Sequence, residues 1–541
     1  MTHLPLRHAT LLVLLAAAPA HAQPELVQLG RSSNLDGHLR PEQHRIAASE
    51  ALDAVIFVHP QDVTVWGGGI VDNGRFRVDL SRDGGQTFRS DLGPLQSTYQ
   101  HVGRGPSIVL YAPGGGADPA AARAVWVGAT LPPGPPTTPG GHVGGATTVN
   151  AAGPIEHNVE TEFDQGTAPE AGFPAGITQG LPGEFWFVDA GAAAAEGSSG
   201  RLNLHRGLWD PLRADVIWQP ATTLAPRHRG AANDVQLHAL NMAFSPDGQI
   251  AWVCFLGDLV GGPDGGLSPV LYRSADGGRT FGPAREVALD QVRVVGDMPS
   301  LSGLLSALGP DPTGLITTTF QADLTVDHAG NPHLLVGVAN LRGHALYTPD
   351  VADGHYLIDL TTASPDGPWV AHVIALLDAH AHEVPGDAET TPYANHPQIA
   401  RTEDGTHVFY SWTDTLSALV GPTAGVNLAP NLRIAGRNLL TGQQVGPIDV
   451  TAGHPIWDGR ALLPAMAPTV LRRPDGYALP IVIAALLQGV NDAPTQYHYV
   501  GNAAVIPFLA LDPEPPDVPD AGPPPAPDAG EAQDAGPLPD A

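Results

Sequence analysis

The sequence predicts an all-β fold, a β-propeller of six or seven blades, from the spacing of its turn residues and from an internal repeat. The chain has 541 residues, of which 64 are glycine and 55 are proline, and no long helical pattern runs through it. Short runs of apolar and aromatic residues are instead broken about every ten residues by turn residues, which is typical of many short strands. A unit of strand, Asp-Gly-type turn and strand recurs along the chain, as expected for radially repeated blades.

The repeating unit is a predicted hairpin. Its clearest copies cover residues 238–255, 321–339, 396–412 and 467–484, with Asp247, Asp327, Asp404 and Asp475 in their turns. Such turns admit the positive φ that tight hairpins need. Looser copies are expected at residues 50–70, with the turn at 59–62, and at 105–131, with the turn at 114–122, and a degenerate copy at 185–218. Many propellers join their first and last strands in one blade, and residues 23–40 or 497–509 are the candidates for this closure.

The N-terminus predicts export. Residues 1–10 contain Arg7 and no acid, residues 11–18 are all apolar, and Ala20-His21-Ala22 has the small-x-small form of a cleavage site. Residues 1–22 are therefore interpreted as a secretory signal peptide. The alternative, a membrane anchor, needs roughly 20 apolar residues, and this run is too short. We expect a secreted, periplasmic or cell-surface bacterial protein with no membrane span.

The C-terminus predicts a disordered tail. From residue 511 to 541 the composition changes to Pro, Asp, Ala and Gly, with related tetrapeptides at 519–522, 527–530 and 533–536 and no aromatic or basic residue. Such a segment cannot bury enough apolar surface to offset its ordering entropy. It serves either as a solubilising appendage, which we favour, or as a spacer to a wall or a partner. Residues 23–510 form the predicted propeller.

Charge and cysteine content exclude several classes of protein. The formal net charge is −29, and all 26 basic residues are arginine. Nucleic acids and anionic membrane surfaces are therefore not expected as partners, because both require concentrated positive charge. Cys254 is the only cysteine, so no intrachain disulfide is possible and stability must come from a large core. A monomer is expected.

Two nearly identical octapeptides give the sharpest local signal. The first contains Ser81, Asp83, Gly85, Thr87 and Phe88; the second contains Ser274, Asp276, Gly278, Thr280 and Phe281. Ser and Asp side chains in such a turn bond its own backbone, and the glycines allow left-handed φ. Both octapeptides resemble the Asp box, S-x-D-x-G-x-T-W/F, of sialidase-like (BNR-repeat) propellers. That resemblance implies a six- or seven-bladed propeller in which these ten residues are structural and lie away from any active centre.

The same resemblance raises the alternative of sialidase-type catalysis. Sialidases clamp a substrate carboxylate with arginines and use a Tyr-Glu pair and an Asp. Arg45 in His44-Arg45-Ile46-Ala47 stands where their first arginine motif would be, with Asp72 following, but the motif's aromatic and proline residues are absent. Further candidates without a recognisable motif are Arg401, Arg433, Arg437, Arg460, Tyr497 and Tyr499. No residue is therefore assigned as catalytic.

Histidines offer a weak metal signal. His380 and His382 lie beside Asp378 and Glu383, with Asn395 and His396 nearby in sequence. A closed zinc site needs further ligands at defined places, so an unliganded pair in an exposed loop is the favoured interpretation. The Asp-Gly-Gly loops of the Asp boxes also lack the spaced carboxylates of a calcium loop. The sequence predicts no metal and no cofactor.

The predicted function follows from two observations: the sequence contains a strong structural repeat, and it contains no complete set of catalytic residues. We expect a non-catalytic propeller that binds a glycan or a protein through its top-face loops. The alternative is a glycan-acting enzyme, such as a sialidase-like glycoside hydrolase. It requires three arginines and a carboxylate to converge on the central cavity.

Overall fold

The structure is a computed structural model that describes part of the chain. It describes residues 26–512 except 34–40, 67–73, 97–101, 132–140, 150–158, 164–171, 193–197, 227–236, 258–265, 297–299, 307–314, 341–354, 365–366, 379–393, 416–426, 428 and 487–493. The predicted signal peptide (1–22) and residues 513–541 of the predicted tail lie outside the described residues. No helix in the described ranges is long and apolar enough to cross a membrane.

The described residues form seven sheets of four or five strands and one small sheet of three. Sheet 1 contains β2 (Ile46–Ser49), β3 (Ala54–Pro60), β4 (Phe76–Ser81) and β5 (Arg89–Leu92). Sheet 2 contains β6 (Val102–Tyr111), β7 (Arg123–Leu131), β8 (Gly141–Thr148) and β9 (Val159–Phe163). Sheet 3 contains β10 (Thr178–Gln179), β11 (Glu184–Ala192), β12 (Ser198–Asp210), β13 (Asp215–Trp218) and β14 (Thr222–Leu224).

The next sheets follow the same order. Sheet 4 contains β15 (Leu237–Phe244), β16 (Ala251–Gly257), β17 (Ser268–Ser274) and β18 (Arg285–Glu286). Sheet 5 contains β20 (Ile316–Val326), β21 (Pro332–Asn340), β22 (His355–Thr361), β23 (Val370–Leu377) and β19 (Arg293–Val294). Sheet 6 contains β24 (Gln398–Arg401), β25 (His407–Thr415), β26 (Pro430–Asn438) and β27 (Gln444–Asp449).

Sheet 7 combines both ends of the described chain. It contains β28 (Leu462–Met466), β31 (Ile481–Leu486), β32 (Thr495–Tyr499) and the N-terminal strand β1 (Val27–Ser32). The small sheet contains β29 (Leu471–Arg473), β30 (Gly476–Ala478) and β33 (Val505–Pro507). Short helices are α1 (Val63–Trp66), α2 (Leu301–Ser306), α4 (Phe508–Leu511) and the 3-10 turns Pro113–Gly115 and Leu289–Gln291.

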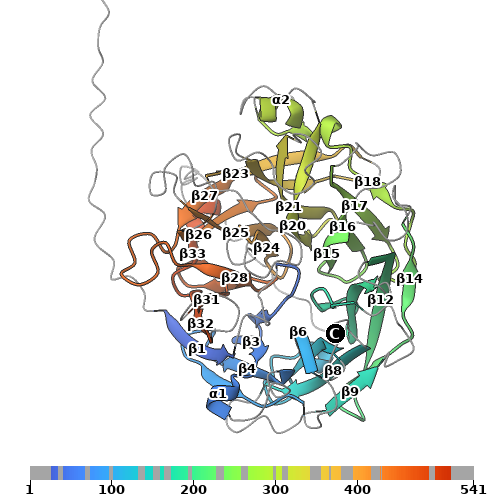
Figure 1. Ribbon diagram of the computed structural model, residues 1–541, viewed down its shortest axis with the longest axis vertical. Helices are drawn as coiled ribbons and strands as arrows, with labels where there is room; N and C mark the ends of the chain where they lie inside the picture. Colours follow the sequence, from blue (N-terminus) through green and yellow to red (C-terminus); the bar gives the residue numbers. More distant parts are fainter. Residues whose placement is uncertain are drawn as a thin grey trace, which may run out of the picture.

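The sheets succeed one another around a ring in chain order (Figure 1). First strands such as β6, β15, β20 and β24 lie towards the middle, and last strands such as β9 and β18 lie at the rim (Figure 1). The ring closes where β1 pairs with β32, with Val27 opposite Tyr499 and Ser32 opposite Thr495. The predicted joining of the first and last strands is therefore present. The all-β, propeller-like architecture predicted from the sequence is confirmed at this level.

Apolar packing between neighbouring sheets holds the ring together. Seven core clusters each join two successive sheets, from sheets 1 and 2 around to sheets 7 and 1. Phe76 and Trp126, for example, meet edge to face at 5.9 Å between sheets 1 and 2. Such burial is the dominant favourable term in folding, and here it is distributed evenly around the ring.

Polar side chains near the axis add a second link between successive sheets. The Asn241 amide on β15 donates to the Ala322 carbonyl of β20 (3.0 Å). The Ile399 amide of β24 donates to Asp323 on β20 (2.9 Å), and the Met466 amide of β28 donates to Gln398 on β24 (2.7 Å). These bonds satisfy buried polar groups and fix the first strand of one sheet against the next.

Most predicted hairpins match observed strand pairs. Residues 238–255, 321–339 and 396–412 form β15–β16, β20–β21 and β24–β25, and residues 105–131 form β6–β7. Residues 185–218 contribute β11, β12 and β13. Asp475 lies between β29 and β30, in an extra hairpin before β31.

The turn predicted at residues 59–62 is wrong, because it was placed at the end of β3 and not at its start. The tight turn of sheet 1 lies at residues 50–53, where the Asp53 amide donates to the Glu50 carbonyl and Asp53 adopts φ 48°. His59 and Pro60 instead end β3, where Pro60 stands opposite Phe76 at the last register position. Pro60 has no N–H to donate, and the next bond to the neighbouring segment is made by the Gln61 amide, which donates to the Arg75 carbonyl (2.7 Å).

Candidate functional site

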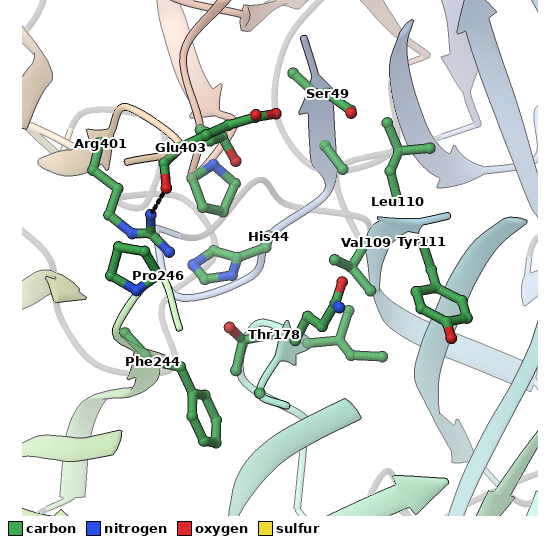
Figure 2. A pocket seen from close by; sticks show the side chains of 18 of the residues that line it. His44, Ser49, Val109, Leu110, Tyr111, Thr178, Phe244, Pro246, Arg401 and Glu403 are labelled. Carbon is green, nitrogen blue, oxygen red and sulfur yellow. Dashed lines mark hydrogen bonds between the residues drawn. The ribbon is translucent and has the colours of Figure 1, made fainter. Parts of the chain in front are cut away.

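A cavity of about 390 Å³ lies where the first strands converge. All seven sheets contribute to its wall, from residues 47–49, 51 and 52 of sheet 1 to Pro468 and Thr469, which follow β28 of sheet 7. Figure 2 shows His44, Thr178, Phe244, Arg401 and Glu403 around the same space. Its volume falls within the range typical of small-molecule sites. This cavity is the candidate functional site.

His44 lines the cavity from the segment that precedes β2. Its side chain is buried, and its Nε2 lies 3.7 Å from Asp323 Oδ1. Asp323 is itself fixed, because its carboxylate accepts the amides of Leu324 and Ile399, both at 2.9 Å. A β-carbon at Gly176 would lie 2.3 Å from the His44 ring, so glycine is required there. The imidazole is therefore held in place by the packing of sheets 1, 3 and 5.

Arg401 and Glu403 bring charge to the cavity wall. The Arg401 guanidinium donates through Nη1 to the carbonyls of Thr402 (3.1 Å) and Glu403 (3.0 Å), the second of which is drawn in Figure 2. Burial lowers the pKa of Arg401 to about 10, although Glu403, Asp404 and Asp327 favour its charged form. The guanidinium remains protonated at neutral pH. It can offer its remaining N–H groups to an acceptor in the cavity.

The rest of the wall is small or uncharged. Ala47, Ala48, Gly116, Gly180 and Ala243 leave room, while Ser49, Thr178 and Gln179 add hydrogen-bonding groups. The Tyr111 ring packs edge to face on Phe185 (5.1 Å), and burial raises the pKa of its hydroxyl. Among the described lining residues, Glu403 is the only carboxylate. The lining therefore suits a polar ligand but lacks the carboxylate pair of most glycoside hydrolases.

The arginines suggested by the sialidase resemblance do not converge in this cavity. Of the candidate arginines, only Arg401 is among the described lining residues. Arg45 is buried, and its guanidinium donates to Gln43 Oε1 at 2.7 Å. Arg433 and Arg437 on β26 face Asp414 (3.3 Å) and Asp359 (3.0 Å), and Arg460 is exposed. The clamp required by the enzymatic alternative is thus not assembled among these residues.

The candidate tyrosines are core residues of sheet 7. The Tyr497 hydroxyl lies 3.0 Å from Ser32 Oγ, and burial raises its pKa against the opposing effect of Arg45. Tyr499 packs against Phe88 at 4.9 Å between ring centroids. Neither residue lines the cavity.

The remaining candidates are separated or lie outside the described residues. Asp72, His380, His382 and Glu383 lie outside them. Asp378 reaches Arg433 at 3.9 Å. His396 is buried, with its amide donating to Gln321 (3.0 Å), and the Asn395 amide group donates to Thr413.

Both predicted Asp boxes adopt the same hydrogen-bonded turn. Asp83 Oδ1 accepts from Ser81 Oγ (2.7 Å) and the Thr87 amide (2.9 Å), and the Gly85 amide donates to Ser81 Oγ (2.6 Å). Asp276 repeats this pattern with Ser274 and Thr280 at 2.7 and 2.9 Å. The turns join the third and fourth strands of sheets 1 and 4, and none of the ten residues lines the cavity. These bonds lower the pKa of Asp276 to about 2.

We expect Asp276→Ala to lower the free energy of unfolding by about 1–2 kcal/mol, because the turn loses a side-chain cap of several N–H and O–H donors. Asp475→Ala is the matched control, since Asp475 is a turn aspartate whose exposed side chain makes no hydrogen bond or ion pair within the described part of the chain. Its effect should stay within about 0.5 kcal/mol. Urea unfolding of both variants makes the comparison, and equal losses would contradict the structural role of the box.

Comparisons with known proteins give only distant matches. No protein-family model matches the sequence, and no curated protein does. A solved α-L-arabinofuranosidase from Fusarium graminearum is 11% identical, covering 78% of this chain and 99% of its own, with a TM-score of 0.39. An exo-1,5-α-L-arabinanase from a bovine ruminal metagenomic library is 12% identical (62% and 98% covered, TM-score 0.30), and the N-terminal domain of Nup159 is 8% identical (87% and 94%, TM-score 0.38). At this distance none of them assigns an activity to this chain.

Proposed function

We propose that this protein is an exported, monomeric, seven-bladed propeller of the Asp-box kind that binds a glycan in its central cavity without transforming it. The seven sheets would be the seven blades, with β1 completing the last one. The two Asp boxes support the kinship, and the N-terminal 22 residues support export. The cavity wall carries the proposal, because it combines one cation, one carboxylate and several hydroxyl and amide groups with small residues.

The polar groups of the wall match the chemistry of a sugar. Hydroxyl groups of a glycan both donate and accept hydrogen bonds, as do Ser49, Thr178 and Gln179. Arg401 would donate to a ring or hydroxyl oxygen, and Glu403 would accept from a hydroxyl. Apolar contact would come from Phe244, which is buried beside the cavity. A compact ligand of mono- or disaccharide size fits these requirements.

We expect Arg401→Met to weaken glycan binding by at least about tenfold, because a hydrogen bond to a charged group contributes about 1.5–3 kcal/mol. Arg472→Met is the matched control. Arg472 is exposed, pairs with Asp404 (2.6 Å) in the turn that follows Arg401, and does not line the cavity. Calorimetry would follow a screen of an array of neutral and acidic mono-, di- and oligosaccharides. A folded wild-type protein that retains no glycan on the array would overturn the proposal.

Catalysis on the bound glycan is the second candidate. The proximity of His44 to Asp323 favours it, because a carboxylate beside an imidazole can orient it as a general base. It predicts release of sugar from an array ligand and loss of turnover in His44→Gln with binding retained. Binding without turnover supports the first proposal instead.

A further inference from the structure

Two histidines and an aspartate meet in the interior between sheets 2 and 3. His142 lies on β8, Asp189 on β11 and His205 on β12, and each residue is at most 3% exposed. Their potential ligand atoms all lie within 4.8 Å of one another. His205 Nε2 is 2.6 Å from Asp189 Oδ2, and His142 Nε2 is 3.4 Å from the same oxygen. Both imidazoles thus direct the same ring nitrogen to one carboxylate.

The surroundings of this cluster fix the orientation of its members. Asp189 Oδ1 accepts from the Asn203 side chain (2.9 Å) and from the Gly172 amide (3.3 Å), which leaves Oδ2 to the histidines. The His205 ring stacks on Phe187 at 4.3 Å with planes 8° apart. The Gly172 carbonyl oxygen lies 3.2 Å from His142 Nε2 and adds a fourth potential ligand atom. A β-carbon at Gly172 would lie 2.1 Å from the Ala190 carbonyl, so the backbone approaches closely here.

The charge of Asp189 distinguishes this cluster from a comparable one. Between sheets 5 and 6, the buried carboxylate of Asp359 is neutralised by Arg437, 3.0 Å away. In the described part of the chain, Asp189 contacts no arginine, only the two histidines, Asn203 and backbone. Burying a carboxylate is costly unless hydrogen bonds or a cation compensate it. Within the described residues Asp189 meets hydrogen-bonding groups and no arginine, so a bound metal ion would supply positive charge that Arg437 supplies to Asp359.

We propose that His142, Asp189 and His205 bind a divalent transition-metal ion of the zinc class that clamps sheets 2 and 3 together. Two imidazole nitrogens and a carboxylate oxygen form a donor set suited to such ions, with outer hydrogen bonds holding the ligands as Asn203 does here. The Gly172 carbonyl is placed to complete a closed site.

The ligand atoms, which lie within 4.8 Å of one another, must shift to accept the ion. Ligand atoms at about 2.1 Å from a tetrahedral zinc ion are roughly 3.4 Å apart. The distance from His142 to Asp189 already has this value, while the distance from His205 to Asp189 must lengthen. To bind the ion, each imidazole must present a bare Nε2 and carry its proton on Nδ1, and this tautomer lacks the Nε2–H hydrogen bond that brings His205 and Asp189 together.

Zinc binding to the intact protein tests the proposal directly. The wild-type protein, treated with EDTA, then incubated with ZnCl2 and desalted, should retain one zinc ion per chain by elemental analysis. Its Tm should rise by a few degrees in excess Zn²⁺, since a ligand that binds only the folded state stabilises it. Co²⁺ should give the visible absorption of a low-symmetry, four-coordinate site.

Variants locate the site. His142→Asn and His205→Gln should each weaken zinc binding by at least about tenfold. His333→Asn is the matched control, because His333 is an equally buried histidine, 3.0 Å from Asp359, in a cluster that already contains an arginine. A wild-type protein that retains no zinc, or zinc retention that is unchanged in both folded site variants, would overturn the proposal. The wild-type titration decides the question even if a variant does not fold.

Discussion

Deleting residues 27–32 is expected to lower the free energy of unfolding by about 5 kcal/mol or more. These residues are β1, the outer strand of sheet 7, and their removal leaves β32 unpaired along one edge and breaks the link between the two ends of the described chain. Leu29 is buried in the core cluster between sheets 7 and 1, and a buried leucine contributes about 1.5–3 kcal/mol. The Gln496 side chain also donates to the carbonyls of Leu29 (2.7 Å) and Gly30 (3.0 Å). Several hydrogen bonds of about 1 kcal/mol each are lost with the strand.

Denaturant unfolding measures this loss, and deletion of residues 513–541 is the control. That segment is predicted to be disordered, so its removal should leave the unfolding midpoint unchanged. Two point variants test the packing of β1 without shortening the chain. In Gly30→Val the new β-carbon would lie 2.5 Å from His59 Nε2, whereas in Gly282→Val the new β-carbon meets nothing closer than 3.7 Å. A β1 deletion with wild-type stability would show that the ring does not depend on closure by this strand.

The sequence predicted the repeated hairpins because several sheets carry a local turn signal. Asp247, Asp327 and Asp404 mark turns between a first and a second strand, and the side-chain bonds that form these turns are local in sequence. The turn of sheet 1 was predicted at the wrong place. The actual turn at residues 50–53 contains no Asp-Gly pair, while the segment around Pro60 resembles a turn in sequence. The sequence left two candidate segments for the closing strand. The two paired strands are more than 460 residues apart, and such pairing leaves no local sequence pattern that identifies it.

The candidate site was harder to predict, since it depends on side-chain direction. His44 and Arg45 are adjacent, yet His44 lines the cavity and the Arg45 guanidinium donates to Gln43. A three-residue motif drew attention to the arginine and could not reveal which of the two faces inwards. The cluster of His142, Asp189 and His205 was missed for a related reason. Its members lie on three strands of two sheets, with no fixed spacing between them.

Asp359→Ala is expected to lower the free energy of unfolding by about 3–5 kcal/mol, because it leaves a buried charge without its partner. Asp359 is fully buried and accepts from Tyr410 Oη (2.8 Å) and His333 Nδ1 (3.0 Å), with Arg437 Nη2 also at 3.0 Å. Adding Arg437→Met should recover part of the loss, since the unpaired guanidinium is removed. Urea unfolding of the two single variants and the double variant measures this coupling. Additive losses would contradict a direct ion pair.

The same network should have a distinct pH signature. Burial alone would lower the pKa of His333, but the charge of Asp359 and hydrogen bonds with Asp327 and Asp359 raise it above its usual value. A histidine with a raised pKa contributes stability that is fully present below about pH 6.5 and is lost as the pH rises through the folded-state pKa. The stability difference between wild type and His333→Asn should therefore shrink above neutral pH. Asp359 remains charged across this range, because His333 and Arg437 hold its pKa far below the usual value despite burial.

His238→Asn supplies the opposite case for this pH series. Burial lowers the pKa of His238 to about 4, so the folded protein excludes a proton that the unfolded chain binds. The free energy of unfolding of the wild type, relative to that of His238→Asn, should therefore increase as the pH rises from about 4 to 6.5. Thermal unfolding of the three proteins at intervals between pH 4 and 9 separates the two slopes. Parallel curves for both variants would mean that His333 folds uncharged, and that Arg437 alone neutralises Asp359.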